Sequence, residues 1–107
     1  MTAGATRLVV GCMTGTSIDG LDAALVRIEG RGLSMRATVE AASATPLNDL
    51  SAPLRALADQ SPMSAGAMAD VARRFGLLHA RAVRELLAGR RADLVVVHGQ
   101  TVFHAPP

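Results

Sequence analysis

Leu94-Val95-Val96-Val97 is the stretch that decides the fold class of this chain. Its four consecutive apolar residues offer no polar face to solvent, which is typical of a parallel strand that is covered on both sides. A long helical pattern precedes the stretch, and the polar residues His98-Gly99-Gln100-Thr101 follow it. A helix that leads back into a buried parallel strand is the basic unit of α/β proteins, so we predict an α/β fold.

The long helix before this strand is predicted from its apolar spacing. It begins at Ser61-Pro62 or at Ser64 and ends at Gly89. Its apolar residues recur at intervals of three and four: Met68, Val71, Phe75, Leu78, Ala82 and Leu86. Gly76 costs about 1 kcal/mol relative to Ala, which one long helix can tolerate. The opposite face is predicted to be solvated and carries four arginines: Arg73, Arg74, Arg81 and Arg84.

Three strands are predicted at the start of the chain. Leu8–Met13 is a short apolar run that enters a polar loop. Leu21–Glu29 and Leu33–Glu40 both alternate with a period of two, as half-buried strands do. Gly30-Arg31-Gly32 lies between them and supplies residues that tolerate a positive φ in a tight reversal. We therefore predict an antiparallel three-strand start.

A weaker helical pattern runs from Asp49 to Asp59, with Ser51 as its expected cap and Pro53 in its first turn. The predicted order is thus an antiparallel three-strand start, a helical crossover and a returning parallel strand. This order resembles the half-domain repeated in the sugar kinase, Hsp70 and actin superfamily. The chain is accordingly predicted to be part of a ribonuclease-H-like, actin-like ATPase domain.

Composition excludes several classes of function. The 107 residues, half of them apolar, suit one core, and the formal charge of +2 comes from eleven dispersed arginines against nine acids. Phe75 and Phe103 are the only aromatic residues, so a platform for stacking bases is missing and nucleic acid is not an expected partner. The single Cys12 excludes an internal disulfide and suits the cytoplasm. The apolar run Leu8–Val10 is too short for a signal peptide or a membrane span.

The segment from Gly11 to Asp22 carries most of the chemical information. Its small residues let backbone N–H groups approach an anion, and Thr14, Thr16 and Ser17 add hydroxyl donors. Asp19 could hold a hydrated Mg²⁺, with Asp22 as a second carboxylate: magnesium needs only one or two carboxylates beside phosphate. The segment is not a Walker loop, because no Gly-Lys-Ser/Thr follows and the loop leads into a strand. Its composition alone favours an ordinary turn over a phosphate site.

The histidines and the cysteine have simpler interpretations. His98 and His104 follow a buried strand, where α/β proteins place ligands, but residue types alone favour a polar turn there. They lack the further ligands that a zinc site requires. His79 is predicted to be a core-edge or surface residue of the long helix. Cys12 is predicted to be a small buried side chain, because no histidine is close in sequence to activate it.

The order of residues in two segments resembles one family. Gly11-Cys12-Met13-Thr14-Gly15-Thr16-Ser17-Ile18-Asp19-Gly20-Leu21-Asp22 is similar to the ATP-binding signature of the anhydro-N-acetylmuramic acid kinases, with Thr14 in place of the usual Ser. His98-Gly99-Gln100-Thr101-Val102-Phe103-His104 and Pro106 resemble a second segment of that family. The resemblance implies ATP and Mg²⁺ binding, with Mg²⁺ held through water by Asp19, at these residues: Gly15, Thr16, Ser17, Ile18, Asp19, Gly20, Leu21 and Asp22. It places the sugar at His98, Gln100, Thr101 and His104.

The resemblance also implies an activity. Family members are expected to open the 1,6-anhydro ring of anhydro-N-acetylmuramic acid with water and to phosphorylate O6 in peptidoglycan recycling. The family's general-base aspartate lies in a Gly-x-Asp-Thr-Gly-Pro-Gly segment that residues 1–107 lack. We therefore expect residues 1–107 to be the N-terminal part of the first ATPase-like domain, with the rest of that domain and the second domain beyond Pro107, and to be inactive alone. The full-length protein could form a homodimer. Two alternatives remain: another sugar kinase of the superfamily, and a truncated, non-catalytic nucleotide-binding domain.

Overall fold

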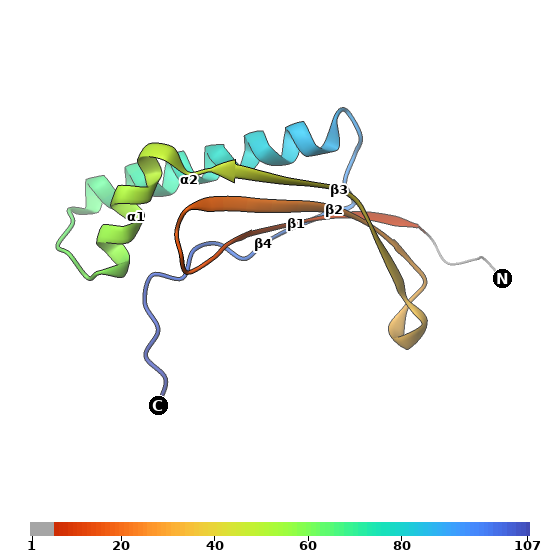
Figure 1. The fold of residues 1–107 in the computed structure, drawn as a ribbon, viewed down its shortest axis with the longest axis horizontal. Helices are drawn as coiled ribbons and strands as arrows, with labels where there is room; N and C mark the ends of the chain where they lie inside the picture. Colours follow the sequence, from red (N-terminus) through yellow and green to blue (C-terminus); the bar gives the residue numbers. More distant parts are fainter. Residues whose placement is uncertain (1–5) are drawn as a thin grey trace.

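The computed structural model describes residues 6–107 and contains one four-stranded sheet in the order β3-β2-β1-β4 (Figure 1). Its strands are β1 (Arg7–Thr14), β2 (Gly20–Glu29), β3 (Arg36–Pro46) and β4 (Leu94–Val97). β1 pairs antiparallel with β2, and β2 with β3, whereas β4 pairs parallel with β1. The predicted α/β order, with an antiparallel start and a parallel returning strand, is therefore confirmed.

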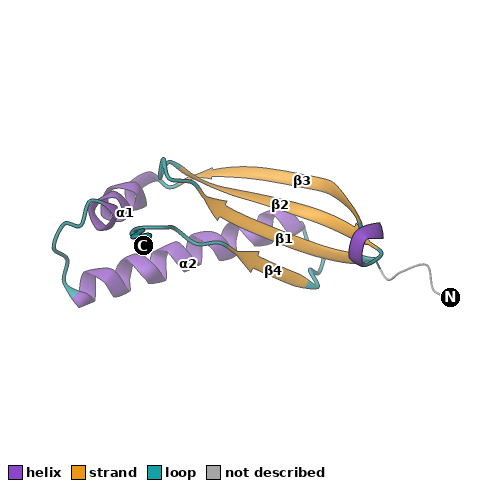
Figure 2. Cartoon of the chain, turned by 90° about the horizontal axis from the view of Figure 1, so that it is seen from below, coloured by secondary structure: helices purple, strands orange, loops and turns teal. Residues whose placement is uncertain are grey.

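The helices follow β3 and return the chain to the sheet. A 3-10 turn, η2 (Asn48–Leu50), continues into α1 (Ser51–Ala58), and α2 (Ala65–Leu87) then runs along one face of the sheet (Figure 2). Ser64 caps α2, because its hydroxyl accepts a hydrogen bond from the amide of Ala67 at 3.1 Å. The helix ends where Ala88 and Gly89 both adopt positive φ, as helix C-termini commonly do. Gly76 does not interrupt it.

Three predicted boundaries are wrong for local reasons. The third strand begins at Arg36 rather than Leu33, because Gly32–Ser34 form a 3-10 turn (η1) that leaves Leu33 fully exposed. The same strand continues to Pro46 past an irregularity in its register with β2, which lies opposite Leu25 and Val26. Ser51 is also not a cap: Leu50 occupies the cap position of α1 without a side-chain hydrogen bond, since η2 leads directly into the helix.

The core lies between the sheet and the helices. Buried side chains come from β1, the β1–β2 loop, β2, the η2 region, α1 and α2: Val10, Cys12, Ile18, Leu21, Ala23, Leu25, Leu47, Leu50, Leu54, Val71 and Ala82. Leu21 and Leu25 of β2 are completely buried, and burial of such a side chain stabilises the fold by about 1.5–3 kcal/mol. The inner face of β2 therefore anchors the loop that precedes it to the core.

β4 is an edge strand in residues 6–107. Leu94, Val95, Val96 and Val97 are 44–56% exposed, although their apolar pattern is typical of a strand that is covered on both sides. One edge of β4 pairs with β1, and the other pairs with no strand within the part of the chain that is described. No helix among these residues is long and apolar enough to cross a membrane.

Candidate functional site

The two sequence motifs meet at one end of the sheet. The hydroxyl of Thr14 donates a hydrogen bond to the carbonyl oxygen of Gly99 at 2.9 Å, and the side-chain amide of Gln100 donates to the carbonyl oxygen of Gly15 at 3.3 Å. β1 and β4 are parallel, so their carboxyl ends lie at the same edge, where α/β proteins bind ligands. The fold thus joins segments that are 85 residues apart in sequence.

The β1–β2 loop is a tight turn with an exposed tip. The amide of Ile18 donates to the carbonyl of Gly15 at 3.1 Å, which leaves Thr16 and Ser17 exposed at the tip. The hydroxyl of Ser17 donates to Oδ1 of Asp19 at 2.9 Å. A turn that exposes successive N–H groups and hydroxyls can bind an anion, and the exposed carboxylate of Asp19 beside it can hold a hydrated cation.

α1 and the turn that follows it contact both motifs through two residues that sequence reasoning missed. Nη2 of Arg55 donates to the carbonyl oxygens of Ser17 at 2.6 Å and Ile18 at 3.2 Å. The side-chain amide of Gln60 donates to the carbonyl oxygen of Val102 at 3.3 Å. Both residues belong to or follow the weakest helical pattern of the chain, and no motif marks them in the sequence.

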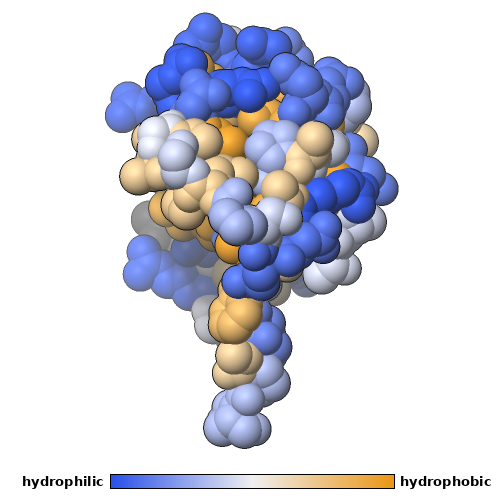
Figure 3. Space-filling model, turned by 90° about the vertical axis from the view of Figure 1, so that its left-hand side faces the viewer, coloured by the Kyte–Doolittle hydropathy of each residue, from blue (hydrophilic) through white to orange (hydrophobic). Residues whose placement is uncertain are grey.

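A cavity of about 370 Å³ lies between the loop and the C-terminal segment, lined by Thr16, Ile18, Ala58, Gln60, Thr101, Val102, Phe103 and His104. Thr16, from the predicted phosphate-binding group, therefore shares one cavity with Thr101 and His104 from the predicted sugar-binding group. Figure 3 views the end of the molecule that carries α1 and the C-terminal segment, where apolar residues are surrounded by hydrophilic ones. Such a mixed surface suits a small molecule with both apolar and polar groups.

Several predicted ligand residues have side chains that are not free to contact a ligand. Ile18 and Leu21 are 4% and 0% exposed, so only their backbone could contact a ligand. Thr14 is 2% exposed and donates its hydroxyl hydrogen to Gly99, so its hydroxyl is not free to donate to a phosphate in this structure. Gly20 pairs with Pro46 of β3 at the start of the sheet.

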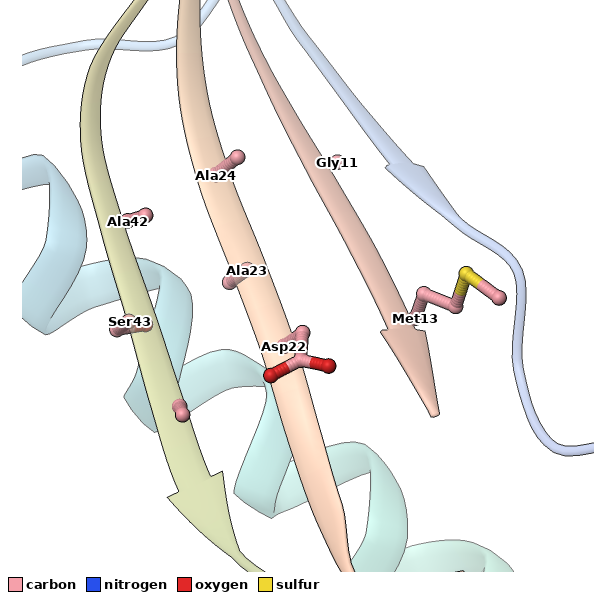
Figure 4. A pocket seen from close by; sticks show the side chains of 8 residues that line it. Gly11, Met13, Asp22, Ala23, Ala24, Ala42 and Ser43 are labelled. Atoms are coloured by element: carbon pink, nitrogen blue, oxygen red, sulfur yellow. The ribbon is translucent and has the colours of Figure 1, made fainter. Parts of the chain in front are cut away.

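Asp22 lies apart from the loop cavity. It projects from β2 into a separate shallow hollow of about 590 Å³ on the outer face of the sheet. Figure 4 shows Asp22 on β2 with Ala24 further along the same strand, while Gly11 and Met13 lie on β1. The carboxylates of Asp19 and Asp22 therefore do not line one cavity, and Asp19 is the carboxylate that belongs to the turn.

The other two predicted sugar-binding residues, His98 and Gln100, differ in exposure and in their hydrogen bonds. His98 is exposed, and its Nδ1 contacts the carbonyl of Gly99 at 3.2 Å. Gln100 is half-buried, and its Nε2 donates to Gly15 and to Thr101, so it orders the loop rather than facing solvent freely. Its Oε1 is buried and accepts no hydrogen bond from residues 6–107.

Cys12 and His79 are core residues. Cys12 is 4% exposed, and burial raises the pKa of its thiol, which keeps it protonated and unreactive. His79 is 7% exposed; its Nδ1–H donates to the carbonyl of Phe75 at 2.8 Å, and its ring contacts the Phe75 ring edge-on at 4.5 Å. Among residues 6–107 no three His, Cys, Asp or Glu side chains cluster as metal ligands, and hydrated magnesium needs no such cluster.

The fold and the position of the loop are those of part of an actin-like ATPase domain. The sequence model of the anhydro-N-acetylmuramic acid kinase family matches residues 7–107, and the chain belongs to this family. It is 40% identical over 102 residues to the anhydro-N-acetylmuramic acid kinase of Acaryochloris marina, and 33% identical over 104 residues to that of Bacillus thuringiensis subsp. konkukian. Each alignment covers 92% of this chain and 27% of the relative, so the chain spans about a quarter of the length of these relatives.

Proposed function

We propose that this chain supplies the phosphate-binding part of the ATP site of an anhydro-N-acetylmuramic acid kinase. The proposed enzyme opens the 1,6-anhydro ring of anhydro-N-acetylmuramic acid with water and phosphorylates O6 to give N-acetylmuramic acid 6-phosphate. One observation carries the proposal: the β1–β2 loop and the segment after β4 are hydrogen-bonded to each other, through Thr14 with Gly99 and Gln100 with Gly15.

The proposed phosphate site is the tip of the turn. The backbone amides of Thr16 and Ser17 and the hydroxyl of Thr16 are the groups that would donate to phosphate oxygens, because both residues are exposed there. Asp19 would hold Mg²⁺ through water, and the cation would neutralise charge on the transferred phosphoryl group. Ser17 donates to the Asp19 carboxylate and so fixes its direction.

Two of the proposed sugar-binding residues line the same cavity as Thr16. These are Thr101 and His104, and the cavity volume of about 370 Å³ lies within the range of small-molecule sites. His98 and Gln100 flank this part of the chain; Gln100 would act mainly by holding Gly15. The arrangement would bring a sugar hydroxyl close to the phosphate that the loop binds.

The proposal assigns a limited role to residues 1–107. They would form the N-terminal part of the first ATPase-like domain of a cytoplasmic enzyme, and the water-activating carboxylate would come from another segment. The matched relatives are long enough to contain one, since the alignments cover 27% of their length. A non-catalytic nucleotide-binding role is the alternative if that carboxylate is missing.

The test uses the natural polypeptide that carries residues 1–107, supplied with ATP, Mg²⁺ and the anhydro sugar in ¹⁸O-labelled water. The anhydro sugar has no free hydroxyl at position six, so phosphorylation requires that water adds at the anomeric carbon. We expect one labelled oxygen at the anomeric carbon and none in the phosphate ester. A better rate with a ring-opened sugar, or label in the ester, would indicate another kinase of the superfamily.

A further inference from the structure

Ile18 has an unusual backbone conformation within the β1–β2 loop. Its φ of +51° lies in the left-handed region, which β-branched residues rarely adopt. Its side chain is only 4% exposed, packed in the core, and its amide closes the turn on Gly15. The turn therefore needs stabilising contacts that hold this conformation.

Arg55 of α1 supplies such contacts from one side of the turn. Its Nη2 donates to the two carbonyl oxygens that flank the α-carbon of Ile18: that of Ser17 at 2.6 Å and that of Ile18 at 3.2 Å. A hydrogen bond from a charged donor is stronger than one between neutral groups. Arg55 forms no ion pair with the acidic residues of the described chain, so these carbonyls are its partners there.

The direction of these two carbonyls decides what the loop offers to an anion. In a trans peptide the C=O and N–H groups point in opposite directions. Because Arg55 holds the Ile18 carbonyl on the α1 side, the amide of Asp19 points to the opposite side. If the Ile18–Asp19 peptide rotated, its carbonyl oxygen would face the anion and repel it, whereas rotation of the Ser17–Ile18 peptide would break the hydrogen bond that closes the turn on Gly15.

We propose that Arg55 is a positioning residue for the phosphate-binding loop, and this proposal rests on the proposed ATP-binding function. Arg55 fixes the two peptides that flank Ile18. The Ser17–Ile18 peptide keeps the turn closed on Gly15, and the Ile18–Asp19 peptide presents the Asp19 amide, rather than a carbonyl oxygen, to the phosphates. Arg55 does so without touching the nucleotide. Its removal should therefore loosen the loop and weaken ATP binding, while the sugar-binding segment keeps its own contacts with Gln60 and Thr14.

The test compares three variants of the natural polypeptide that carries this segment. R55M keeps the aliphatic stem and removes the donor, R55K keeps a charged nitrogen on a shorter side chain, and R81M is the matched control on the exposed face of α2. Three quantities are measured: amide hydrogen exchange of residues 15–20 without ligand, KM for ATP, and KM for the sugar. Circular dichroism confirms that each variant is folded.

For R55M we expect the exchange rate of the loop amides and KM for ATP to rise about tenfold, because the loss of one hydrogen bond from a charged donor corresponds to a change of about that size. KM for the sugar should stay within about twofold of its value in the unmodified protein. R55K should recover part of both effects, and R81M should match the unmodified protein. Loop exchange in R55M and R55K that equals that of R81M would overturn the proposal, as would equal increases in both KM values. If the unmodified protein uses no ATP, the proposed function fails, and the exchange data alone decide whether Arg55 holds the loop.

Discussion

Thr14→Val isolates the hydrogen bond that joins the two motifs. Valine has nearly the shape of threonine, so the variant replaces a hydroxyl with a methyl group at a position that is 2% exposed. The lost bond is the 2.9 Å contact with the Gly99 carbonyl, which retains a contact from Nδ1 of His98 at 3.2 Å. A neutral hydrogen bond contributes about 0.5–1.5 kcal/mol, so we expect the free energy of unfolding to fall by about 1 kcal/mol.

Thr45→Val is the matched control for this prediction. Thr45 lies on β3 opposite Leu21 and is half-buried, and its hydroxyl makes no hydrogen bond with the protein among residues 6–107. Its replacement should leave the free energy of unfolding unchanged within about 0.5 kcal/mol. Urea unfolding of both variants of the natural polypeptide, followed by circular dichroism, provides the comparison.

Kinetics separate a structural role for Thr14 from a catalytic one. If the hydroxyl only joins the loop to Gly99, Thr14→Val should lower kcat/KM for ATP by no more than about the tenfold that a loss of 1.4 kcal/mol represents. A hydroxyl that donates to the transferred phosphoryl group should instead cost about 100-fold or more in kcat. A loss of that size with unchanged stability would refute the reasoning, as would equal stability of Thr14→Val and Thr45→Val.

Three further predictions follow from the site and the core. Asp19→Asn should lower kcat/KM for Mg²⁺-ATP by an amount that corresponds to about 2–4 kcal/mol of lost transition-state stabilisation, while KM for the sugar stays constant. Equal losses for both substrates in steady-state kinetics would contradict the role of Asp19. Because burial raises the pKa of Cys12, its thiol should react slowly with a disulfide reagent at neutral pH, and rapid labelling of the folded protein would contradict this. The free energy of unfolding should also fall as the pH rises past the ordinary pKa of a thiol, because the unfolded chain loses its thiol proton at a lower pH than the folded chain. Purified residues 1–107 should bind a hydrophobic dye through exposed β4 and produce no phosphorylated sugar; a sharp monomeric melt without dye binding, or turnover above background, would argue against this.

Regular elements with strong periodicity could be predicted from the sequence. The strands around Leu8–Met13 and Leu21–Glu29 and the long helix from Ser64 are confirmed, because their patterns reflect which face is buried. The strand at Leu94–Val97 was correctly predicted to be parallel, but its exposure depends on which neighbours are present, and no local pattern encodes that.

The site was predicted in outline rather than in detail. The two motifs identified the loop and the C-terminal segment, yet nothing in their residue types indicated that Thr14 would be used internally, that Asp22 would face another hollow, or that Ile18 would adopt a positive φ. Arg55 could not be found because its role arises from the approach of α1 to the turn, a long-range contact without a local signature. These features depend on tertiary geometry.

The pairing of β1 with β4 also has a kinetic consequence. β1, β2 and β3 are neighbours in sequence as well as in the sheet, so their pairings close short loops. The contacts of Thr14 with Gly99 and of Gly15 with Gln100 each span 85 residues, and the entropy cost of closing so long a segment must be met before they can form. We therefore expect the meander to assemble early and β4 to dock late. On a ribosome, the loop would be synthesised first among the parts of the site and completed last.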